Sequence, residues 1–509
     1  MAVSDLPAPR WVKLLDQSRC IGCHACTTAC KSENEVPVGV TRTYVKSVDV
    51  GVFPQARRAF QVTRCNQCED APCVAACPTR AMYRREDGIV DFDKSVCIGC
   101  KACMAACPYD AIFINPEDHS AEKCNMCAHR LDMGLEPACV TVCPTEAILV
   151  GDLNDPASKV AQTINREPVQ VRRPEKNTRP GVFYKGAHQA TLDPLAARRP
   201  DGGLFAWATQ GPPDPQLVTS GHPDRTVSSA AALLSYDVPH QAPWGWRVSL
   251  YTWTKSIAAG SFAVPVALAC AGVLAWGNAA VRWAAPTLTL AFLAVTGGLL
   301  IADLKHPMRF GLIFTRHHWR SWLVRGAFIL GGYGTAVALY LVAALTDSVL
   351  ARQILGVAGL PLAAAAAVYT AYLFAQAKAR DMWQSPLLPP HLAVQATLAG
   401  AAAMLPLLAW LAPGRAATAG EVILAVAAAA HLALAAGEIT LPHVTAHARL
   451  AADEMTKGRY RGTFGLGMVL IAVAVAAPWI GTLATPFALA GLLAYEHAYV
   501  QAGQSVPLA

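Results

Sequence analysis

The sequence has few charged residues and lacks the short motifs that mark nucleotide-binding proteins. Asp, Glu, Lys and Arg make up 15% of the 509 residues, whereas hydrophobic residues make up 54%. Neither G-x-G-x-x-G nor G-x-x-x-x-G-K-S/T occurs, so the usual dinucleotide and P-loop fingerprints are absent. The Lys and Arg residues are not interleaved with aromatic residues, and the net charge of +7 therefore does not indicate a nucleic-acid partner.

The start of the sequence also lacks an export signal. MAVSDLPAPRWVKLL contains neither an apolar signal-peptide core nor a twin arginine. Disulfide scaffolds are small secreted proteins, so the 17 cysteines of this sequence do not indicate a disulfide framework. We expect the part that carries the cysteines to remain in the cytoplasm.

Sixteen cysteines fall into four groups that indicate iron–sulfur clusters. CIGCKACMAACP at 97–108 has the C-x2-C-x2-C-x3-C-P spacing of bacterial two-cluster ferredoxins. Zinc sites use two separated C-x2-C pairs, and a run with three close cysteines overfills a tetrahedral site. The fourth cysteine of such a run reaches a neighbouring cluster, so one run implies another. The groups are Cys20, Cys23, Cys26, Cys30; Cys65, Cys68, Cys73, Cys77; Cys97, Cys100, Cys103, Cys107; and Cys124, Cys127, Cys139, Cys143.

The sequence between the cysteine groups predicts short strands and helices. AMYRREDGIVDFD, at 81–93, alternates around Asp87-Gly88, which predicts a β-hairpin. The stretch between Cys127 and Cys139 predicts one short helix that ends at Gly134. His129 lies in this stretch, but all four cysteines of the group are present, which favours a surface role. A strand, a turn, a strand and a cluster loop follow each other as in ferredoxins.

These cysteine groups, together with GDLNDPASKVAQTI and RPGVFYKGA, resemble the four-cluster electron-transfer subunits of the dimethyl sulfoxide reductase type. The resemblance extends from about Trp11 to Gly186 and implies an α+β double ferredoxin-like domain over residues 1–186. It also implies four 4Fe–4S clusters whose cysteines come from interleaved groups. The implied sets are Cys20, Cys23, Cys26 with Cys143; Cys124, Cys127, Cys139 with Cys30; Cys65, Cys68, Cys73 with Cys107; and Cys97, Cys100, Cys103 with Cys77.

The remaining sequence divides into a linker and a membrane domain. Residues 187–245 are rich in proline, glycine and charge, which predicts a linker. Residues 246–509 contain repeated uncharged runs of spanning length, which predict an all-α polytopic domain. The uncharged stretch from Thr463 to Tyr495 would be about 50 Å long as one helix, so we expect two spans there. The expected spans are 256–276, 283–302, 326–345, 353–377, 392–412, 421–438, 463–481 and 484–502.

Loop charge predicts the orientation of this membrane domain. Nearly all its Lys and Arg residues fall on the side of the cysteine domain, and the opposite side carries only Arg282, Arg352 and Arg415. Positive charge accumulates on cytoplasmic loops. We therefore expect a multi-pass protein of the bacterial inner membrane with its iron–sulfur domain in the cytoplasm.

Three stretches of the membrane half, ADLKHPMRF, SWLVRGAFIL and AQAKARDMWQSPLLPP, resemble the membrane subunits of the polysulfide reductase (NrfD-like) family. Lys305 and Arg309 stand at basic positions of the first motif. The resemblance covers roughly 250–500 and implies a quinone-reactive anchor without haem that docks a four-cluster subunit. The two subunits would be fused in this sequence.

Polar residues near the span ends are the candidates for a quinone site, because such groups are costly in lipid unless they are paired or hydrated. They are Lys255, Asp303, His306, Tyr372, Glu438 and His443. Of these, Asp303, His306, Lys255 and Glu438 could exchange protons with the quinone carbonyls. The alternatives are snorkelling side chains and a structural pair of Asp303 with Arg309. His431 lies within a span as a candidate proton relay or haem ligand, but only His497 is available to face it, so no haem is expected.

The sequence thus predicts an electron-transfer and anchor subunit of an oxidoreductase complex rather than a catalytic subunit. The resemblance implies a separate molybdopterin subunit that acts on a sulfur compound such as sulfite, a sulfoxide, thiosulfate or polysulfide, with membrane quinone as the other partner. Two alternatives remain open at this stage. One is the same role for a hydrogenase, a formate dehydrogenase or a nitrite reductase, and the other is a proton-translocating module. Cys270, alone in an apolar span, is expected to be a packing residue.

Overall fold

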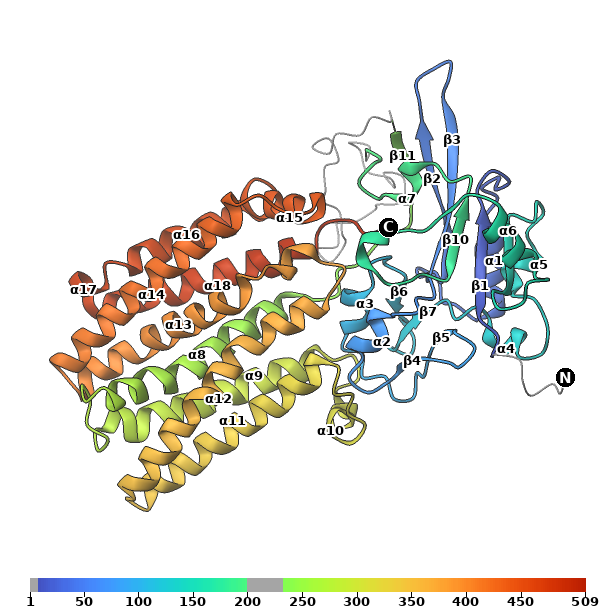
Figure 1. Ribbon diagram of the computed structural model, residues 1–509. Helices are drawn as coiled ribbons and strands as arrows, with labels where there is room; N and C mark the ends of the chain where they lie inside the picture. The colour runs from blue at the N-terminus through green and yellow to red at the C-terminus, as the bar shows by residue number, and fades with distance from the viewer. Residues whose placement is uncertain (1–7, 199–231) are drawn as a thin grey trace.

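The computed structural model describes residues 8–198 and 232–509. The cysteine-bearing domain lies at one end of the molecule and a bundle of long helices at the other (Figure 1). The first described residues lie at the far end of the cysteine domain, and the last lie near its junction with the bundle. This arrangement agrees with the predicted fold class, an α+β domain followed by an all-α membrane domain.

A four-stranded sheet joins the two ends of the cysteine domain's sequence. Its order is β8 (Ile148–Asp152), β1 (Trp11–Asp16), β10 (Val182–Lys185) and β9 (Val169–Gln170). Strand β1 is antiparallel to β8 and parallel to β10. Helix α6 (Lys159–Arg166) covers this sheet, with Val160 packed among apolar residues of β1. The short apolar run after Trp11 therefore forms a central strand.

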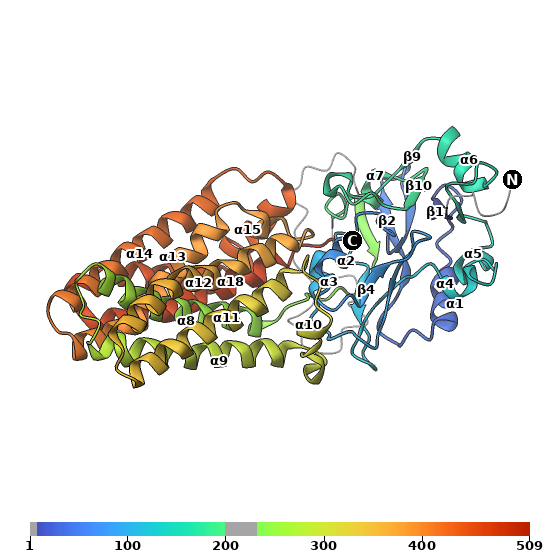
Figure 2. The ribbon, with the colours of Figure 1, turned by 60° about the horizontal axis from the view of Figure 1, so that its bottom comes forward.

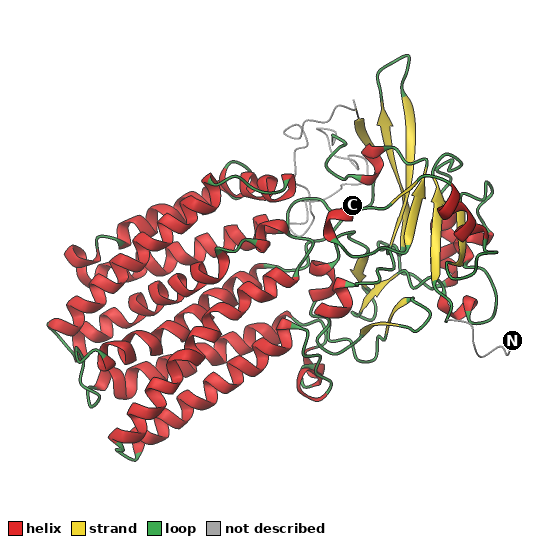
Figure 3. Cartoon of the chain, in the orientation of Figure 1, coloured by secondary structure: helices red, strands yellow, loops and turns green. Residues whose placement is uncertain are grey.

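A second sheet includes part of the predicted linker. Strands β2 (Thr43–Val50) and β3 (Arg57–Arg64) form a long hairpin, and β11 (Ala232–Tyr236) pairs antiparallel with β2. Figure 3 shows this hairpin projecting from the domain. Residues 232–236 therefore belong to the sheet of the cysteine domain, because the apolar side chains Ala232 and Leu234 are buried with Val48 and Val50. The middle of the predicted linker lies outside the described residues.

Two small hairpins and five short helices carry the cysteine loops. Strands β4 (Met82–Arg84) and β5 (Val90–Phe92) pair around Gly88, which has a φ of +84° and confirms the predicted hairpin. Strands β6 (Ile112–Ile114) and β7 (Ala121–Lys123) form the equivalent pair. The helices are α1 (Ala25–Glu33), α2 (Pro72–Ala76), α3 (Ala102–Ala106), α4 (Ala128–Leu131) and α5 (Ala138–Thr141).

Seven helical segments in the described ranges are long and apolar enough to cross a membrane. A further apolar helix, α16, is shorter than these seven and lies near the predicted position of the seventh span. Figure 2 shows the helices running side by side away from the cysteine domain. The helices are α8 (Trp246–Cys270), α9 (Ala285–Asp303), α11 (Trp322–Leu345), α12 (Val349–Gln376), α13 (Leu388–Leu411), α14 (Arg415–Thr440), α16 (Arg461–Ala474) and α18 (Ala484–Gly503).

The first span differs most from its predicted bounds. Helix α8 begins at Trp246, well before the expected start near 256. Lys255, expected at the end of this span, is therefore inside the helix and fully buried. The stretch before Lys255 is polar, which suggested that it lies outside the span. Neighbouring helices cover this stretch instead, so it forms the first turns of α8.

Small residues allow α8 and α13 to cross closely. A Cβ atom at Gly260 would lie 1.9 Å from the carbonyl oxygen of Ala396, and one at Gly400 would lie 2.0 Å from the backbone of Gly260. In lipid, helices associate by such close packing rather than by the hydrophobic effect. The two helices can therefore hold a shared set of buried polar side chains in register.

Candidate functional site

The loops of the helical domain bind the cysteine loop at 97–103 through its backbone. Arg309 Nη1 donates to the carbonyl oxygens of Lys94 and Cys97, each at 3.0 Å. The His306 N–H donates to the Ile98 carbonyl at 3.2 Å. Pro307 begins a short 3-10 turn, Pro307–Arg309, after the end of α9, and a proline there prevents α-helix from continuing through this loop. Arg309 is thus a docking residue, and it does not pair with Asp303.

The neighbouring cysteine loop, which contains Cys77, is held in the same way. His318 donates its backbone N–H to the Pro78 carbonyl at 3.0 Å, and the Ser321 hydroxyl donates to the Ala76 carbonyl at 2.9 Å. Gln376, at the end of α12, donates to the Ala75 carbonyl at 3.2 Å. The two cysteine loops nearest the bundle are therefore fixed to it at several points.

Gly99 permits the closest approach of the two domains. Its φ is +67°, and a Cβ atom there would lie 2.4 Å from Cβ of Lys305. Any side chain at this position would push the cysteine loop away from the end of α9. The glycine in the C-I-G-C run therefore serves the contact between domains as well as the turn.

The sixteen cysteines come together in four sets. Electrostatic interactions connect Cys100 and Cys103 with Cys77, Cys68 and Cys73 with Cys107, Cys30 with Cys124, Cys127 and Cys139, and Cys20 with Cys143. Small cavities lie within the first and the last of these sets. The last cysteine of each group thus lies near cysteines of another group.

The chemistry of these cysteine sets suits the binding of an iron–sulfur cluster. Burial, with added repulsion from neighbouring cysteines, raises the pKa of Cys26 to about 11 and of Cys30 to about 12. Thiolates rather than thiols bind metal, so thiols whose pKa is raised by burial need a strongly positive group to ionise them. Among the described residues, no three His, Cys, Asp or Glu side chains are placed to hold a single metal ion.

The four sets form a series that starts at the helical domain. Cys103 interacts with Cys73, Cys65 with Cys124, and Cys26 with Cys139. These electrostatic neighbours link the set of Cys100, beside the helices, through two intermediate sets to the set of Cys20. Cys23, in this last set, is exposed, and its neighbour Ile21 has 58% of its surface accessible. The series thus runs from the membrane domain to an open surface.

Two buried cations approach one cysteine of the third set in the series. Lys13 Nζ and Arg64 Nη1 lie 3.5 and 3.2 Å from Cys139 Sγ, and both side chains are buried. Burial raises the pKa of Cys139, but Lys13 and Arg64 outweigh this effect and bring it to about 7. The surroundings of Cys139 are therefore electropositive and favour its thiolate.

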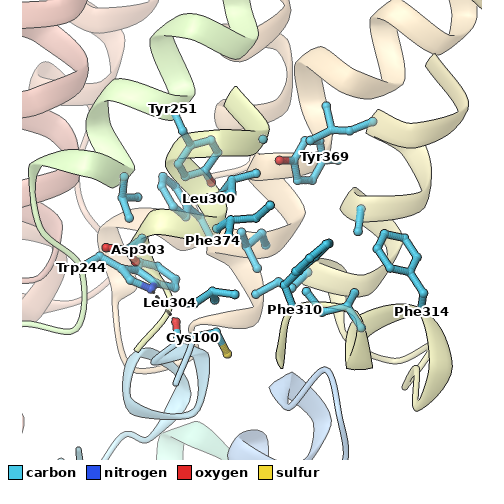
Figure 4. Close-up of a pocket in the computed structure, with 18 residues that line it drawn as sticks. Cys100, Trp244, Tyr251, Leu300, Asp303, Leu304, Phe310, Phe314, Tyr369 and Phe374 are labelled. Carbon is cyan, nitrogen blue, oxygen red and sulfur yellow. Dashed lines mark hydrogen bonds between the residues drawn. The ribbon is translucent and has the colours of Figure 1, made fainter. Parts of the chain in front are cut away.

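A cavity of about 220 Å³ lies between the helical domain and Cys100. Its walls are mainly apolar and come from α8, α9, α11, α12 and the short helix α10 (Leu312–Thr315). Figure 4 shows Tyr251 and Tyr369 toward the bundle and Cys100 toward the cysteine domain. Trp244 also lines the cavity, and its indole Nε1 donates to the Cys100 carbonyl at 3.3 Å. A flat apolar molecule in this cavity would touch the loop that bears Cys100.

Asp303 is the sequence-predicted residue that lines this cavity. Its carboxylate lies 2.9 Å from Lys101 Nζ, and both side chains are largely buried. Lys101 follows Cys100 directly, so this pair connects the cavity with the cysteine loop. Asp303 terminates α9 because the backbone leaves the helix at Leu304 to reach Gly99.

The other sequence-predicted residues lie in different places. Lys255 does not line the cavity, and its Nζ lies 5.4 Å from the ring centroid of the lining residue Tyr369. His306 faces His119 of the cysteine domain, with 6.5 Å between ring centroids, and Tyr372 stacks on Trp322. His443 lies in the loop that follows α14. Glu438 belongs to a separate buried cluster with His391 and Tyr495.

Sequence reasoning missed four residues at the cavity: Tyr251, Tyr369, Trp244 and Lys101. Tyr251 precedes Lys255 by four residues, so the two share one helix face, but this signal needs the correct start of α8. Lys101 and Trp244 come from outside the membrane spans. His391, which faces His431, was missed because it lies just before the expected start of its span.

Comparisons with known proteins match two kinds of domain in the sequence. Residues 56–153 match the 4Fe–4S dicluster domain, residues 11–32 a 4Fe–4S binding domain, and residues 236–492 the family described as polysulphide reductase, NrfD. The thiosulfate reductase electron transfer subunit PhsB of Salmonella typhi is 47% identical over 35% of this protein and 95% of its own length. A tetrathionate reductase subunit of Salmonella typhimurium is 44% identical over 38% and 78%. A polysulfide reductase component of Wolinella succinogenes is 42% identical over 35% and 94%.

Proposed function

Because this protein belongs to the polysulphide reductase NrfD family and fuses that membrane domain to an iron–sulfur domain, we propose that it carries electrons between a quinone and a catalytic subunit. The quinone binds in the cavity beside Cys100. The catalytic subunit docks on the opposite end of the cysteine domain, near Cys23. The observation that carries this proposal is the series of four cysteine sets that connects these two places.

Four 4Fe–4S clusters occupy the four cysteine sets, and they supply one-electron carriers. The protein's own residues place the first of them. Arg309, His306 and Trp244 fix the loop of Cys97 and Cys100 on the membrane domain through backbone carbonyls. The exposed surface around Ile21 and Cys23 supports an exit toward a second protein.

The cavity has the composition that a quinone needs. Ligand sites are mostly apolar with a few polar groups that fix orientation, and here the polar groups are Tyr251, Tyr369 and Asp303. A quinone gains or loses a proton at each carbonyl oxygen as it is reduced or oxidised. Asp303, held by Lys101, serves one oxygen, and the two tyrosines are placed to serve the other.

The relatives support the nature of the partner. Their names describe components of tetrathionate, polysulfide and thiosulfate reductases, which supports a catalytic subunit that acts on a sulfur compound. We propose that this subunit carries molybdopterin. The complex resides in the bacterial inner membrane with the cysteine domain on the cytoplasmic side. Basic loops such as the one containing Arg309, Arg316 and Arg320 support this side.

Asp303→Asn tests the quinone site. The variant should insert, keep its clusters and lose quinol-linked turnover by about 10²-fold or more, because an acid–base group is removed. Turnover of the catalytic partner with a soluble artificial donor should stay normal. Iron content and paramagnetic resonance of the clusters serve as folding readouts.

A matched control is Glu421→Gln, a carboxylate on α14 outside the cavity lining. It should leave both kinds of turnover unchanged. Normal quinol oxidation by Asp303→Asn, or loss of its clusters, would make Asp303 a structural partner of Lys101 and would refute its role at the quinone.

A further inference from the structure

A second group of polar side chains lies inside the helical bundle, outside the lining of the quinone cavity. His391 Nε2 and His431 Nδ1 are 2.9 Å apart, and Tyr495 donates to Glu438 Oε2 at 2.8 Å. His391 Nδ1 lies 3.3 Å from Glu438 Oε1. All four side chains are buried. Charged and titratable groups at this depth are costly unless they are paired or functional.

This His–Glu–Tyr cluster is not fully hydrogen-bonded. His431 Nε2 has no partner among the described residues, and the His391 and Glu438 atoms that lie 3.3 Å apart are not aligned for a hydrogen bond. Buried polar groups in folded proteins are nearly always satisfied, and each exception calls for an explanation. An additional proton on this cluster would give one of these unpaired atoms a hydrogen to donate. A network with only a structural role would have no need of such unpaired atoms.

Glu496 connects the cluster with α8. Its Oε2 accepts from the Thr252 hydroxyl at 2.9 Å, and its Oε1 lacks a partner within the part of the sequence that the structure describes. A void of about 10 Å³ is lined by Thr252, Gln395, Tyr495 and Glu496, and this volume is about what one water needs. Glu496 and Tyr495, a member of the cluster, therefore border the same void.

The same carboxylate is electrostatically connected to the quinone cavity. Glu496 interacts with Lys255, and Lys255 Nζ lies over the ring of Tyr369. Tyr251 interacts with Tyr369, Asp303 and Glu496. Polar groups thus follow one another from the cavity to His431. Toward the other end of the bundle, the neighbours of His431 on α14 are apolar, with Leu424 and Ala428 buried.

We propose that His391, His431 and Glu438 form a proton-loading site that exchanges a proton with the quinone cavity. The proposal rests on quinone binding beside Cys100. Oxidation of a quinol breaks two O–H bonds and releases two electrons and two protons. The electrons leave singly toward the catalytic subunit. One proton passes to Asp303, and the other passes by Tyr251 and Glu496 to the loading site, and quinone reduction reverses each transfer.

The charge of the surrounding groups is consistent with such loading. Lys255 offsets Glu496, whereas Glu438 contacts His391 and Tyr495 and depends on the imidazoles for compensation. A proton on the His391–His431 pair therefore neutralises a buried carboxylate. The titratable groups that face this path are Tyr251 and Lys255 on α8, Asp303 on α9, Tyr369 on α12, His391 on α13, His431 and Glu438 on α14, and Tyr495, Glu496 and Tyr499 on α18.

Infrared difference spectroscopy on the full protein in its complex, in lipid nanodiscs, tests this proposal. Bound quinone is cycled between its oxidised and reduced forms while carboxyl and imidazole bands are recorded. We expect a Glu438 carboxylate band that shifts with the redox state of the quinone and disappears in Glu438→Gln, and imidazole bands that disappear in His431→Gln. The single-turnover rate of quinol oxidation should fall by roughly 10²-fold in Glu438→Gln, with a larger solvent deuterium isotope effect.

His497→Gln is the matched control, because His497 is next to Glu496 on α18 but contacts Tyr460 at the helix edge. It should leave the bands and the rate unchanged. Redox-linked bands that are identical in wild type and in both cluster variants would overturn the proton-loading site. If wild-type protein shows no quinone signals at all, the quinone proposal itself fails, and the two failures are thereby distinguished.

Discussion

Lys13 and Arg64 show how single residues distinguish otherwise similar cysteine sets. Both donate to Cys139 Sγ from buried positions on β1 and β3. The charge near a cluster and the hydrogen bonds to its sulfurs are among the protein's means of setting the reduction potential. The set of Cys30, Cys124, Cys127 and Cys139 is therefore expected to hold the electron most favourably of the four.

Lys13→Met should lower the midpoint potential of the cluster bound by Cys139. A unit charge about 5 Å away at an effective dielectric of about 20 contributes roughly 3 kcal/mol, which corresponds to on the order of 100 mV for one electron. Redox titration followed by paramagnetic resonance measures the shift. Lys185→Met is the control, because its ammonium pairs with Asp16 and Glu167 at the surface. Equal shifts in both variants would contradict a local effect.

Cys30→Ser tests the interleaved sets at the level of one ligand. Cys30 interacts with Cys124, Cys139 and Cys127, so the variant should damage their cluster and spare the cluster at Cys20. Site-assigned paramagnetic resonance together with iron content would measure this difference. Selective loss of the signal from Cys20, Cys23 and Cys26 would show that Cys30 belongs to its own group instead.

At the scale of elements, the crossing of α8 and α13 decides where polar groups meet. Gly260 and Gly400 allow the two helices to touch, and this contact holds Lys255 of α8 and His391 of α13 inside the same bundle. The short loops after α9 have a comparable role, because they turn Asp303 toward Lys101 and Arg309 toward the Cys97 carbonyl. Elements far apart in the sequence thus build each polar site.

Gly400→Ala should destabilise the bundle by about 1–3 kcal/mol, the usual cost of overpacking. The added methyl group would meet the Gly260 backbone at 2.0 Å, which backbone atoms cannot avoid by a rotamer change. The melting temperature of the purified complex is the measurement. Gly331→Ala, where no heavy atom lies within 4 Å, is the control and should be neutral or slightly stabilising. Equal melting temperatures in the two variants would argue against close α8–α13 packing.

At the scale of the whole molecule, the cysteine domain and the C-terminal residues lie on one side of the bundle. Arg380 Nη1 donates to the Val506 carbonyl, and Arg172 Nη2 of the cysteine domain donates to the Leu508 carbonyl. The C-terminal residues are therefore built into the junction of the two domains. This arrangement requires an even number of membrane crossings, which the seven long apolar segments of the described residues reach if the shorter helix α16 also crosses.

Protease sites inserted in two loops should report the orientation. A site after Val444, which is fully exposed on the side of the cysteine domain, should be cut only in inside-out vesicles. A site after Gly414, in the loop between α13 and α14 at the other end, should be cut only in right-side-out vesicles. The reverse pattern would place the iron–sulfur domain outside the cytoplasm.

The cysteine spacing and the apolar runs determined the two kinds of domain. Ligand spacing is local along the sequence, so CIGCKACMAACP specifies its cluster type without knowledge of the fold. Spans are equally local, because the bilayer sets a minimum apolar length. The hairpin at Asp87-Gly88 also follows from local backbone preferences. The helix predicted to end at Gly134 ends earlier, at Leu131, and Gly134 takes a positive φ in the turn that follows.

Tertiary structure alone decided which polar residues meet. A pair of Asp303 with Arg309 of the following loop was the structural alternative from the sequence, but the residue that pairs with Asp303 is Lys101, from a segment about 200 residues earlier. His431 on α14 pairs with His391 on α13. Lys255 is inside α8 because neighbouring helices bury the polar first turns of this helix, which the sequence predicted to lie outside the span. Such pairs depend on how helices cross and which loops dock, and neither the spacing nor the composition of one segment contains that information.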